Sequence, residues 1–296
     1  MGMSGFESIG EKSMDKIQPH ITELFDEDSD KIDSGKSGSG RIRFEHVEPK
    51  DIERRSMEII REELSRRGVK LPETEAPVIE RCIHTSADFD YYENLVFSAN
   101  AVERMRAALS AGAVIVTDTE MAKAGISKVT TAKYDCKLRC FMSDSEVASE
   151  AKKRGVTRAT VSMEHAARLA KQLPKIKISI QDESERFIAV SSDNSVKAKN
   201  KNRSNASLSN IIFAIGNAPT ALIELERLIR EANLRPAGII AVPVGFVNVV
   251  EAKELIWELR NSEKYSDIPL IVARGRKGGS NIAAAIVNAL MYGITD

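Results

Sequence analysis

A glycine-rich segment with three cationic side chains is the part of the sequence best suited to bind an anion. Residues 273–281 read ARGRKGGSN, so Arg274, Arg276 and Lys277 precede two glycines and the start of a predicted helix. The first N–H groups of a helix lack partners and carry partial positive charge, so anions bind there. Glycines let the backbone approach a ligand closely. The alternative is an ordinary strand-to-helix turn with solvated basic residues, and the segment alone leaves both interpretations open.

Histidine is the side chain that most readily exchanges a proton near neutral pH, and the chain has four. His84 follows an apolar helical stretch and precedes TSADFD, a place from which a side chain can project into a cleft. By spacing alone, a single histidine at a helix end is more often structural than catalytic. His165 is expected on a helix surface, and His20 and His46 lie in or beside a polar N-terminal segment.

The cysteines and the known catalytic motifs narrow the chemistry. Cys82, Cys136 and Cys140 form an odd, sparse set, which argues against a disulfide framework and favours a reducing, cytoplasmic compartment. Cys136 and Cys140 have no neighbouring Cys or His pair, so buried thiols are favoured over a metal site, and we predict no metal. The chain contains neither the glycine fingerprints of nucleotide-binding folds nor a GxSxG nucleophile motif.

Charge and hydropathy exclude two classes of partner. Lys and Arg total 43 and Asp and Glu total 43, so the formal net charge is zero and a generic nucleic-acid binder is disfavoured. No apolar run approaches the roughly 18 residues of a membrane span, and the acidic N-terminus is unlike a secretory signal. We therefore expect no nucleic-acid partner, no membrane association and a cytoplasmic protein.

The elements that must position these residues follow from a repeated pattern of apolar runs and helices. Runs that are apolar on both faces precede helical patterns, as in a parallel sheet covered by helices; they lie at 113–118, 137–143, 211–216, 238–245 and 269–275. The pattern predicts a doubly wound α/β domain with five parallel strands, helices on both faces and the flavodoxin-like strand order. Ligands bind beyond the carboxyl ends of such strands. The candidate segments there are TDTEM, MSDSE, GNAPT, PVGFV and RGRKGGS.

Two segments fall outside this pattern. Residues 1–45 are rich in Gly, Ser, Asp and Lys and are predicted to be a disordered tail, which leaves 46–296 as the folded domain. Residues 174–210 are polar and lysine-rich apart from two alternating stretches, and we interpret them as a surface insertion with a possible small hairpin. Because the insertion precedes a strand at its amino end, we predict that it is not catalytic.

Several of these motifs resemble those of the precorrin-8X methylmutase family, which includes the cobalt-precorrin-8 methylmutases. The most specific are AIGNAPTAL (214–222), PVGFVNVVEAK (243–253) and VARGRKGGSNIAAAIVNAL (272–290). RCIHTSADFDYYENLVFS (81–98) and AGAVIVTDTEMAKAGI (111–126) also match. The resemblance runs from about Ile52 to Ile294, apart from the insertion.

The resemblance implies a fold, a reaction and a catalytic residue. The fold would be a flavodoxin-like homodimer with active sites near the subunit interface. The reaction would shift a methyl group from C-11 to C-12 of precorrin-8X or cobalt-precorrin-8, giving hydrogenobyrinate or cobyrinate without an external cofactor. The family's catalytic histidine corresponds to His84, which would donate a hydrogen bond or a proton to the macrocycle.

The resemblance also suggests which residues would hold the substrate. Ser56 and Arg158 match substrate-contacting positions of the family, and basic or glycine-rich positions suit a ring that carries carboxylate arms. The remaining candidates are Asn217, Thr220, Gly245, Arg274, Arg276, Gly278, Gly279 and Ser280. Two rival functions stay open: a non-catalytic corrinoid-binding module of the same fold, which would not need His84, and a nucleotide-binding enzyme. The sequence does not say whether the substrate contains cobalt.

Overall fold

The computed structural model describes residues 45, 47–178, 189–191 and 207–294 of the chain. The chain divides into two units, Met1–Val47 and Glu48–Asp296. The predicted tail therefore lies, except for Glu45, outside the described residues. The second unit carries every helix and strand discussed below.

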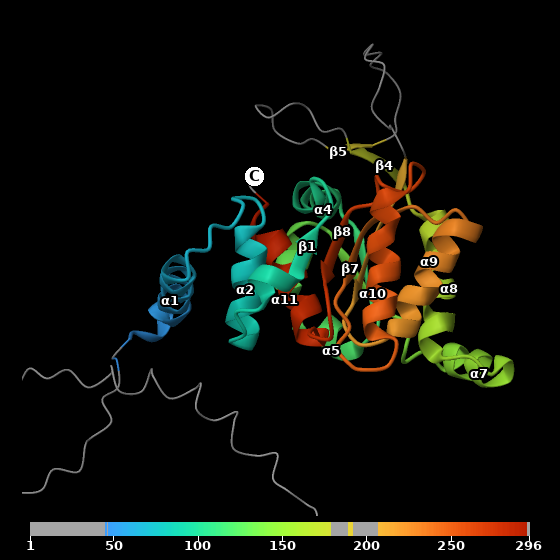
Figure 1. The fold of residues 1–296 in the computed structure, drawn as a ribbon. Helices are drawn as coiled ribbons and strands as arrows, with labels where there is room; N and C mark the ends of the chain where they lie inside the picture. Colours follow the sequence, from blue (N-terminus) through green and yellow to red (C-terminus); the bar gives the residue numbers. More distant parts are fainter. Residues whose placement is uncertain (1–44, 46, 179–188, 192–206, 295–296) are drawn as a thin grey trace, which may run out of the picture. The chain divides into compact units, whose positions relative to one another are not determined.

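A mostly parallel sheet of eight strands forms the centre of the second unit (Figure 1). Six strands lie in the order β1-β8-β7-β6-β2-β3, and β8, β7, β6, β2 and β3 are parallel neighbours. β1 runs antiparallel along β8. The bounds of these strands are β1 Leu95–Phe97, β2 Val114–Thr117, β3 Lys137–Cys140, β6 Leu208–Ile215, β7 Pro236–Ala241 and β8 Leu270–Ala273.

All five predicted parallel strands are present, but the prediction undercounted the sheet. The strand β1 has only three residues, too few to show an alternating pattern, and it lies in a stretch that we interpreted through its helices. The other two additional strands, β4 (Lys175–Ile178) and β5 (Ala189–Ser191), form an antiparallel pair, and β4 also pairs with β6.

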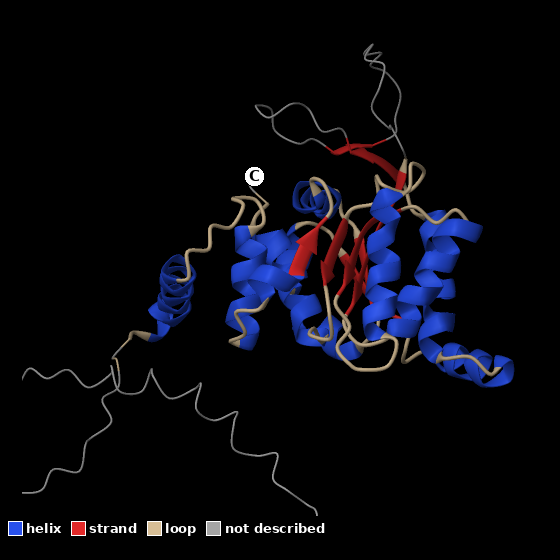
Figure 2. Cartoon of the chain, viewed as in Figure 1, coloured by secondary structure: helices blue, strands red, loops and turns tan. Residues whose placement is uncertain are grey.

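Helices cover both faces of the sheet (Figure 2). Side chains alternate across each strand: Ile115 of β2 contributes to the core beneath α2, α4 and α11, whereas Val114 and Val116 contribute to the core beneath α8, α9 and α10. The helices are η2 Pro49–Asp51, α1 Ile52–Arg66, α2 Ala76–Ser86, α3 Tyr91–Asn94, α4 Ala101–Ser110, α5 Glu120–Gly125, α6 Lys128–Lys133, α7 Ser145–Arg154, α8 Arg158–Gln172, α9 Pro219–Glu231, α10 Val249–Trp257, η3 Glu258–Asn261 and α11 Ser280–Tyr292.

The described part of the predicted insertion lies at the amino end of β6. β4 and β5 form the small hairpin that the alternating stretches suggested. Residues 179–188 and 192–206 lie outside the described part of the chain. The predicted boundary at 210 is too late, because β6 begins at Leu208 and is buried along its whole length. The last three residues of the predicted insertion therefore belong to the central strand.

Candidate active site

Four strand-to-helix loops meet at the carboxyl ends of the parallel strands, at the lower edge of Figure 1. The hydroxyls of Thr119, after β2, and Ser280, after β8, lie 2.7 Å apart. A Cβ atom built on Gly216, after β6, would lie 2.7 Å from the carbonyl oxygen of Gly279. A Cβ atom on Gly278 would lie 2.1 Å from the carbonyl oxygen of Val242, after β7. The glycines are required because these loops touch backbone to backbone.

A buried carboxylate holds the turn after β6. Asp118 follows β2, is fully buried, and accepts hydrogen bonds from the N–H groups of Gly216, Asn217 and Ala218 at 2.9, 2.8 and 2.6 Å. Burial raises the pKa of Asp118, and the three N–H bonds oppose that rise. These bonds use the backbone donors of the turn that precedes α9.

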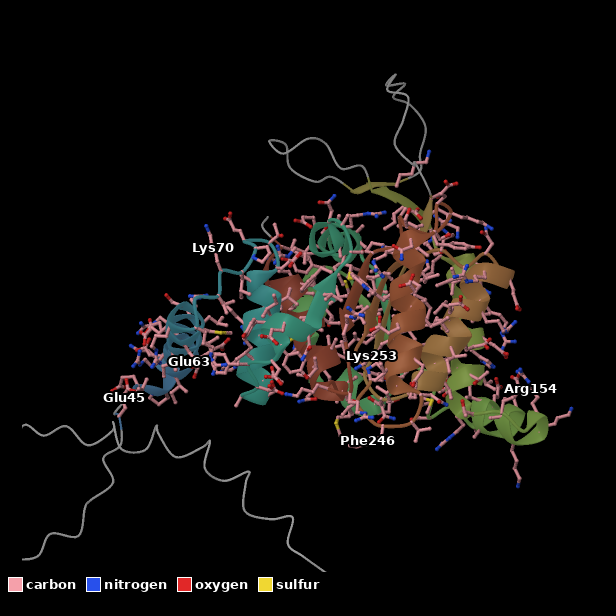
Figure 3. All side chains as sticks on the ribbon, in the orientation of Figure 1. Glu45, Glu63, Lys70, Arg154, Phe246 and Lys253 are labelled. Carbon is pink, nitrogen blue, oxygen red and sulfur yellow. The ribbon has the colours of Figure 1, made fainter. Side chains whose placement is uncertain are left out.

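A buried lysine holds the loop after β8, residues 274–279, which we call the anion loop. Lys253 on α10 is fully buried, and its Nζ donates to the carbonyl oxygens of Gly275 at 2.9 Å and Lys277 at 2.8 Å. Burial lowers the pKa of Lys253 to about 8. Figure 3 shows Lys253 within the body of the domain and Phe246 at its lower edge.

The anion loop presents N–H donors rather than carbonyls. The third carbonyl, that of Arg276, accepts a bond of 3.2 Å from the N–H of Gly245. In the part of the chain that the structure describes, the N–H groups of 275–278 have no hydrogen-bond partner, and neither do the first three N–H groups of α11. Gly279 donates to Val242. The loop and the start of α11 are thus suited to an anion.

The three cations of the anion loop differ in how far they are neutralised. The Arg274 guanidinium forms two bonds with Glu254, of 2.8 and 2.7 Å, which raise the pKa of Arg274. The Lys277 ammonium lies 2.7 Å from Asp88 and also pairs with Asp90. Among the described residues, Arg276 has no acidic partner, and its guanidinium lies 5.5 Å from the centre of the Phe246 ring. Arg276 is therefore the loop cation available to a ligand.

His84 lies in the last turn of α2, which ends at the same edge as these loops (Figure 1). The loop after α2 touches the anion loop through the pairing of Lys277 with Asp88. The His84 side chain is half-buried and has no hydrogen bond or ion pair with any described residue. Its neighbours Arg81 and Thr85 line a hollow of about 290 Å³ between α2 and α11. The imidazole of His84 is not part of the lining of that hollow; it lies one helical turn from Arg81 and has no partner among the described residues.

The other predicted residues divide into two groups. Asn217 is exposed and Thr220 half-buried at the start of α9, and the Thr157 hydroxyl lies 3.1 Å from that of Thr220. This contact brings the exposed Arg158, the first residue of α8, beside them. Ser56 forms the second group and lies one helix away from His84, on α1, which packs on α2. Its hydroxyl donates a hydrogen bond to the carbonyl of Ile52 within α1.

Two important charged residues, Asp118 and Lys253, escaped the sequence analysis, although each left a trace. Asp118 ends the otherwise apolar run AVIVTD. Lys253 stands at the apolar spacing of Val249, Ala252 and Ile256, all of which are buried. A charge on the buried face of a helix is rare unless it has a partner.

Two further observations concern metals and membranes. Within the described residues, no three His, Cys, Asp or Glu side chains gather as a metal site. No helix in that part of the chain has the length and apolar character needed to cross a bilayer.

Comparison with known proteins agrees with the motifs. The precorrin-8X methylmutase family profile matches residues 51–180 and 173–293. The cobalt-precorrin-8 methylmutase of Leptospira interrogans is 37% identical over 242 residues, which cover 82% of this chain and 92% of that protein. The enzyme of the same name from Salmonella typhimurium is 38% identical over 215 residues, or 73% and 80% of the two chains.

A solved structure gives the same result. The precorrin-8X methylmutase of Thermus thermophilus superposes with a TM-score of 0.63 at 30% sequence identity, and the match covers 82% of this chain and 95% of that one. The family profile matches most of the chain, in two segments that overlap at residues 173–180, where the predicted insertion begins. The resemblance inferred from the motifs is confirmed: the chain belongs to the precorrin-8X methylmutase family.

Proposed function

We propose that this protein catalyses the methyl shift from C-11 to C-12 of precorrin-8X or cobalt-precorrin-8, a step of cobalamin biosynthesis. The bond from the methyl group to C-11 breaks as the bond to C-12 forms, so no co-substrate is consumed. Family membership supports the reaction, and one observation of this molecule carries the proposal. A free histidine, His84, lies at the same edge of the sheet as a loop built to bind anions.

The anion loop suits the carboxylate arms of a corrinoid. Arg276 can pair with one carboxylate in a bidentate geometry. The unpaired N–H groups at Gly278 and Ser280 can receive another, favoured by the positive end of α11. Arg274 would contribute less, because Glu254 already holds its guanidinium.

The apolar ring requires a different surface, and the loop after β7 offers one. Val244, Phe246 and Val247 are 48%, 81% and 77% exposed, which is unusual for three apolar residues in so short a segment. Gly245 links this loop to the carbonyl of Arg276, and the Arg276 guanidinium lies over Phe246. Apolar and cationic contacts therefore lie side by side, as an apolar ring with carboxylate arms would need.

His84 is the proposed catalytic residue. A hydrogen bond or proton from its imidazole to the conjugated ring would stabilise charge that develops as the methyl group moves. The side chain has no competing partner among the residues described, so it is free to act on a ligand. Arg158, Asn217 and Thr220 would contact the part of the substrate that lies over α8 and α9, and Ser56 would contact it from α1.

We further propose that the domain is flavodoxin-like and acts as a homodimer. Numbered among themselves, the five parallel strands run 2-1-3-4-5, the order of the flavodoxin-like class. The hollow lined by Arg81 and Thr85 measures about 290 Å³, at the low end for a ligand site, which supports completion of the site by a second subunit. Ile52 and Ile59 leave apolar surface on α1 for such a contact. Sedimentation analysis would test the dimer. A reducing, cytoplasmic location is the setting we propose.

The reaction is tested by absorption spectroscopy of the protein with precorrin-8X and, separately, with its cobalt form. Wild type should convert one of them to the hydrogenobyrinate or cobyrinate spectrum, and His84→Ala should lose at least a hundredfold in kcat while still binding. His165→Ala is the matched control, because His165 pairs with Glu150 on α7 and should be dispensable. Binding without conversion by wild type would identify a corrinoid carrier instead.

A further inference from the structure

Lys253 contacts the anion loop at two points, and its helix contacts it at a third. Its Nζ donates to the carbonyl oxygens of Gly275 and Lys277, at 2.9 and 2.8 Å, on either side of Arg276. The next residue of α10, Glu254, binds the guanidinium of Arg274. Consecutive residues of one helix therefore fix three of the first four residues of the loop.

These contacts account for the polarity of the loop. With the Arg276 carbonyl bonded to Gly245, three successive carbonyls accept bonds from the protein, while the N–H groups of the same stretch have no partner in the described chain. A loop whose carbonyls were free to rotate outward would repel a carboxylate. The ammonium group prevents this by holding two of the three carbonyls inward.

We propose that Lys253 is a positioning residue for the methylmutase reaction: it holds the carbonyls of the anion loop away from the substrate so that Arg276 and the loop N–H groups face the substrate carboxylates. The inference rests on the proposed function, because it names a group that shapes the binding surface of that same site. Lys253 itself is fully buried and does not touch the substrate.

A purely structural lysine would act differently. The flanking buried residues Val249, Ala252 and Ile256 are apolar, so an apolar side chain at 253 would suit the packing of α10 equally well. The ammonium is needed only by the two carbonyls of the loop. Its loss should therefore change the affinity for an anionic substrate more than the rate of the chemical step.

The test compares Lys253→Met, which keeps the length and loses the charge, with wild type and with Lys152→Met. Lys152 is an exposed residue of α7 and serves as the matched control. KM and kcat are measured with whichever corrinoid wild type converts. Lys253→Met should raise KM at least tenfold and change kcat less than threefold, and the control should match wild type.

Amide deuterium exchange provides a second readout that needs no turnover. In Lys253→Met, the amides of Arg274 and Gly279, which donate to the carbonyls of Asn94 and Val242, should exchange at least tenfold faster than in wild type. The amides of the turn at 216–218, held by Asp118, should be unchanged. A folded Lys253→Met with KM within twofold of wild type would refute the positioning role.

A variant that fails to fold does not leave the question open. Lys253→Arg keeps the charge and the donors but cannot place a planar guanidinium where an ammonium made both bonds. KM should then rise at least threefold with kcat retained, and an unchanged KM would overturn the proposal. Failure of the proposed function is recognised separately, because in that case wild type converts neither corrinoid while the exchange difference at Arg274 and Gly279 persists.

Discussion

Two neighbouring loops at the carboxyl edge are each held by a buried charge, but the charges are opposite. The turn at 216–218 is held by the Asp118 carboxylate through three N–H groups. The anion loop is held by the Lys253 ammonium through two carbonyls. Both loops precede a helix of thirteen residues, α9 or α11.

The difference determines which loop can bind an anion. A helix start attracts anions only while its N–H groups are unpaired. Asp118 already uses the donors before α9, so that helix start carries its own internal anion. Lys253 uses carbonyls, so the donors before α11 stay free among the residues described. The buried partner, rather than the helix itself, decides where a substrate carboxylate can bind.

The largest expected effect comes from removing the carboxylate. Asp118→Ala leaves three N–H groups without an acceptor, two of them buried, and we expect the free energy of unfolding to fall by about 3–5 kcal/mol. Urea unfolding measures this loss. Asp144→Ala is the control, because its exposed pair with Arg139 should contribute less than about 1 kcal/mol. A loss below about 1 kcal/mol for Asp118→Ala would show that the turn does not depend on the carboxylate.

The second effect concerns how closely the anion loop approaches β7. In Gly278→Ala the new methyl group would lie 2.1 Å from the Val242 carbonyl oxygen, at a φ of +155°. We expect the free energy of unfolding to fall by about 2–3 kcal/mol, because backbone must move. Gly275→Ala, at a φ of +73° with nothing within 4 Å, should lose only about 1 kcal/mol. Both losses are measured by urea unfolding. Equal losses for the two variants would mean that the positive φ, rather than the clash with the Val242 carbonyl, determines the loss of stability at Gly278.

The sequence predicted most of the fold because apolar runs and helix periodicity are local signals. The five parallel strands follow directly from runs such as AVIVTD, whereas the three-residue β1 gives no such run. The β4–β5 hairpin was expected from alternation, but its attachment to β6 depends on a tertiary contact. The predicted end of the insertion, at residue 210, was wrong because the polar segment continues into a buried strand that begins at Leu208.

The candidate site was predictable only in part, because its contacts join distant residues. The glycines and arginines of the anion loop are visible in the sequence. That Glu254 neutralises Arg274 while Arg276 has no acidic partner in the described chain depends on packing. Asp118 and the residues that it binds are about 100 positions apart, as the separations of 98, 99 and 100 show. No local pattern reports such a pair.

The third prediction contrasts side chains of the two loops. Arg276→Ala should raise KM about tenfold, equivalent to about 1.4 kcal/mol of binding, with kcat little changed. Asn217→Ala, in the turn whose donors Asp118 already uses, should raise KM less than threefold. Steady-state kinetics on folded variants decides between them. A larger effect at Asn217 than at Arg276 would reverse the proposed assignment of the anion-binding loop.

The smallest effect distinguishes the two buried charges by pH. Burial lowers the pKa of Lys253 to about 8, whereas in the unfolded chain a lysine titrates near pH 10.4. Between these values the native state binds fewer protons than the unfolded state, so the contribution of Lys253 to the free energy of unfolding rises with pH. From pH 7.5 to 9, wild type should gain about 1 kcal/mol relative to Lys253→Met, measured as a difference of differences in urea unfolding. Lys152→Met should show no such change relative to wild type, because that side chain is exposed.

If the difference between wild type and Lys253→Met stayed constant, the ammonium would titrate normally despite its burial. The two carbonyls of the anion loop would then suffice to offset the cost of burying it.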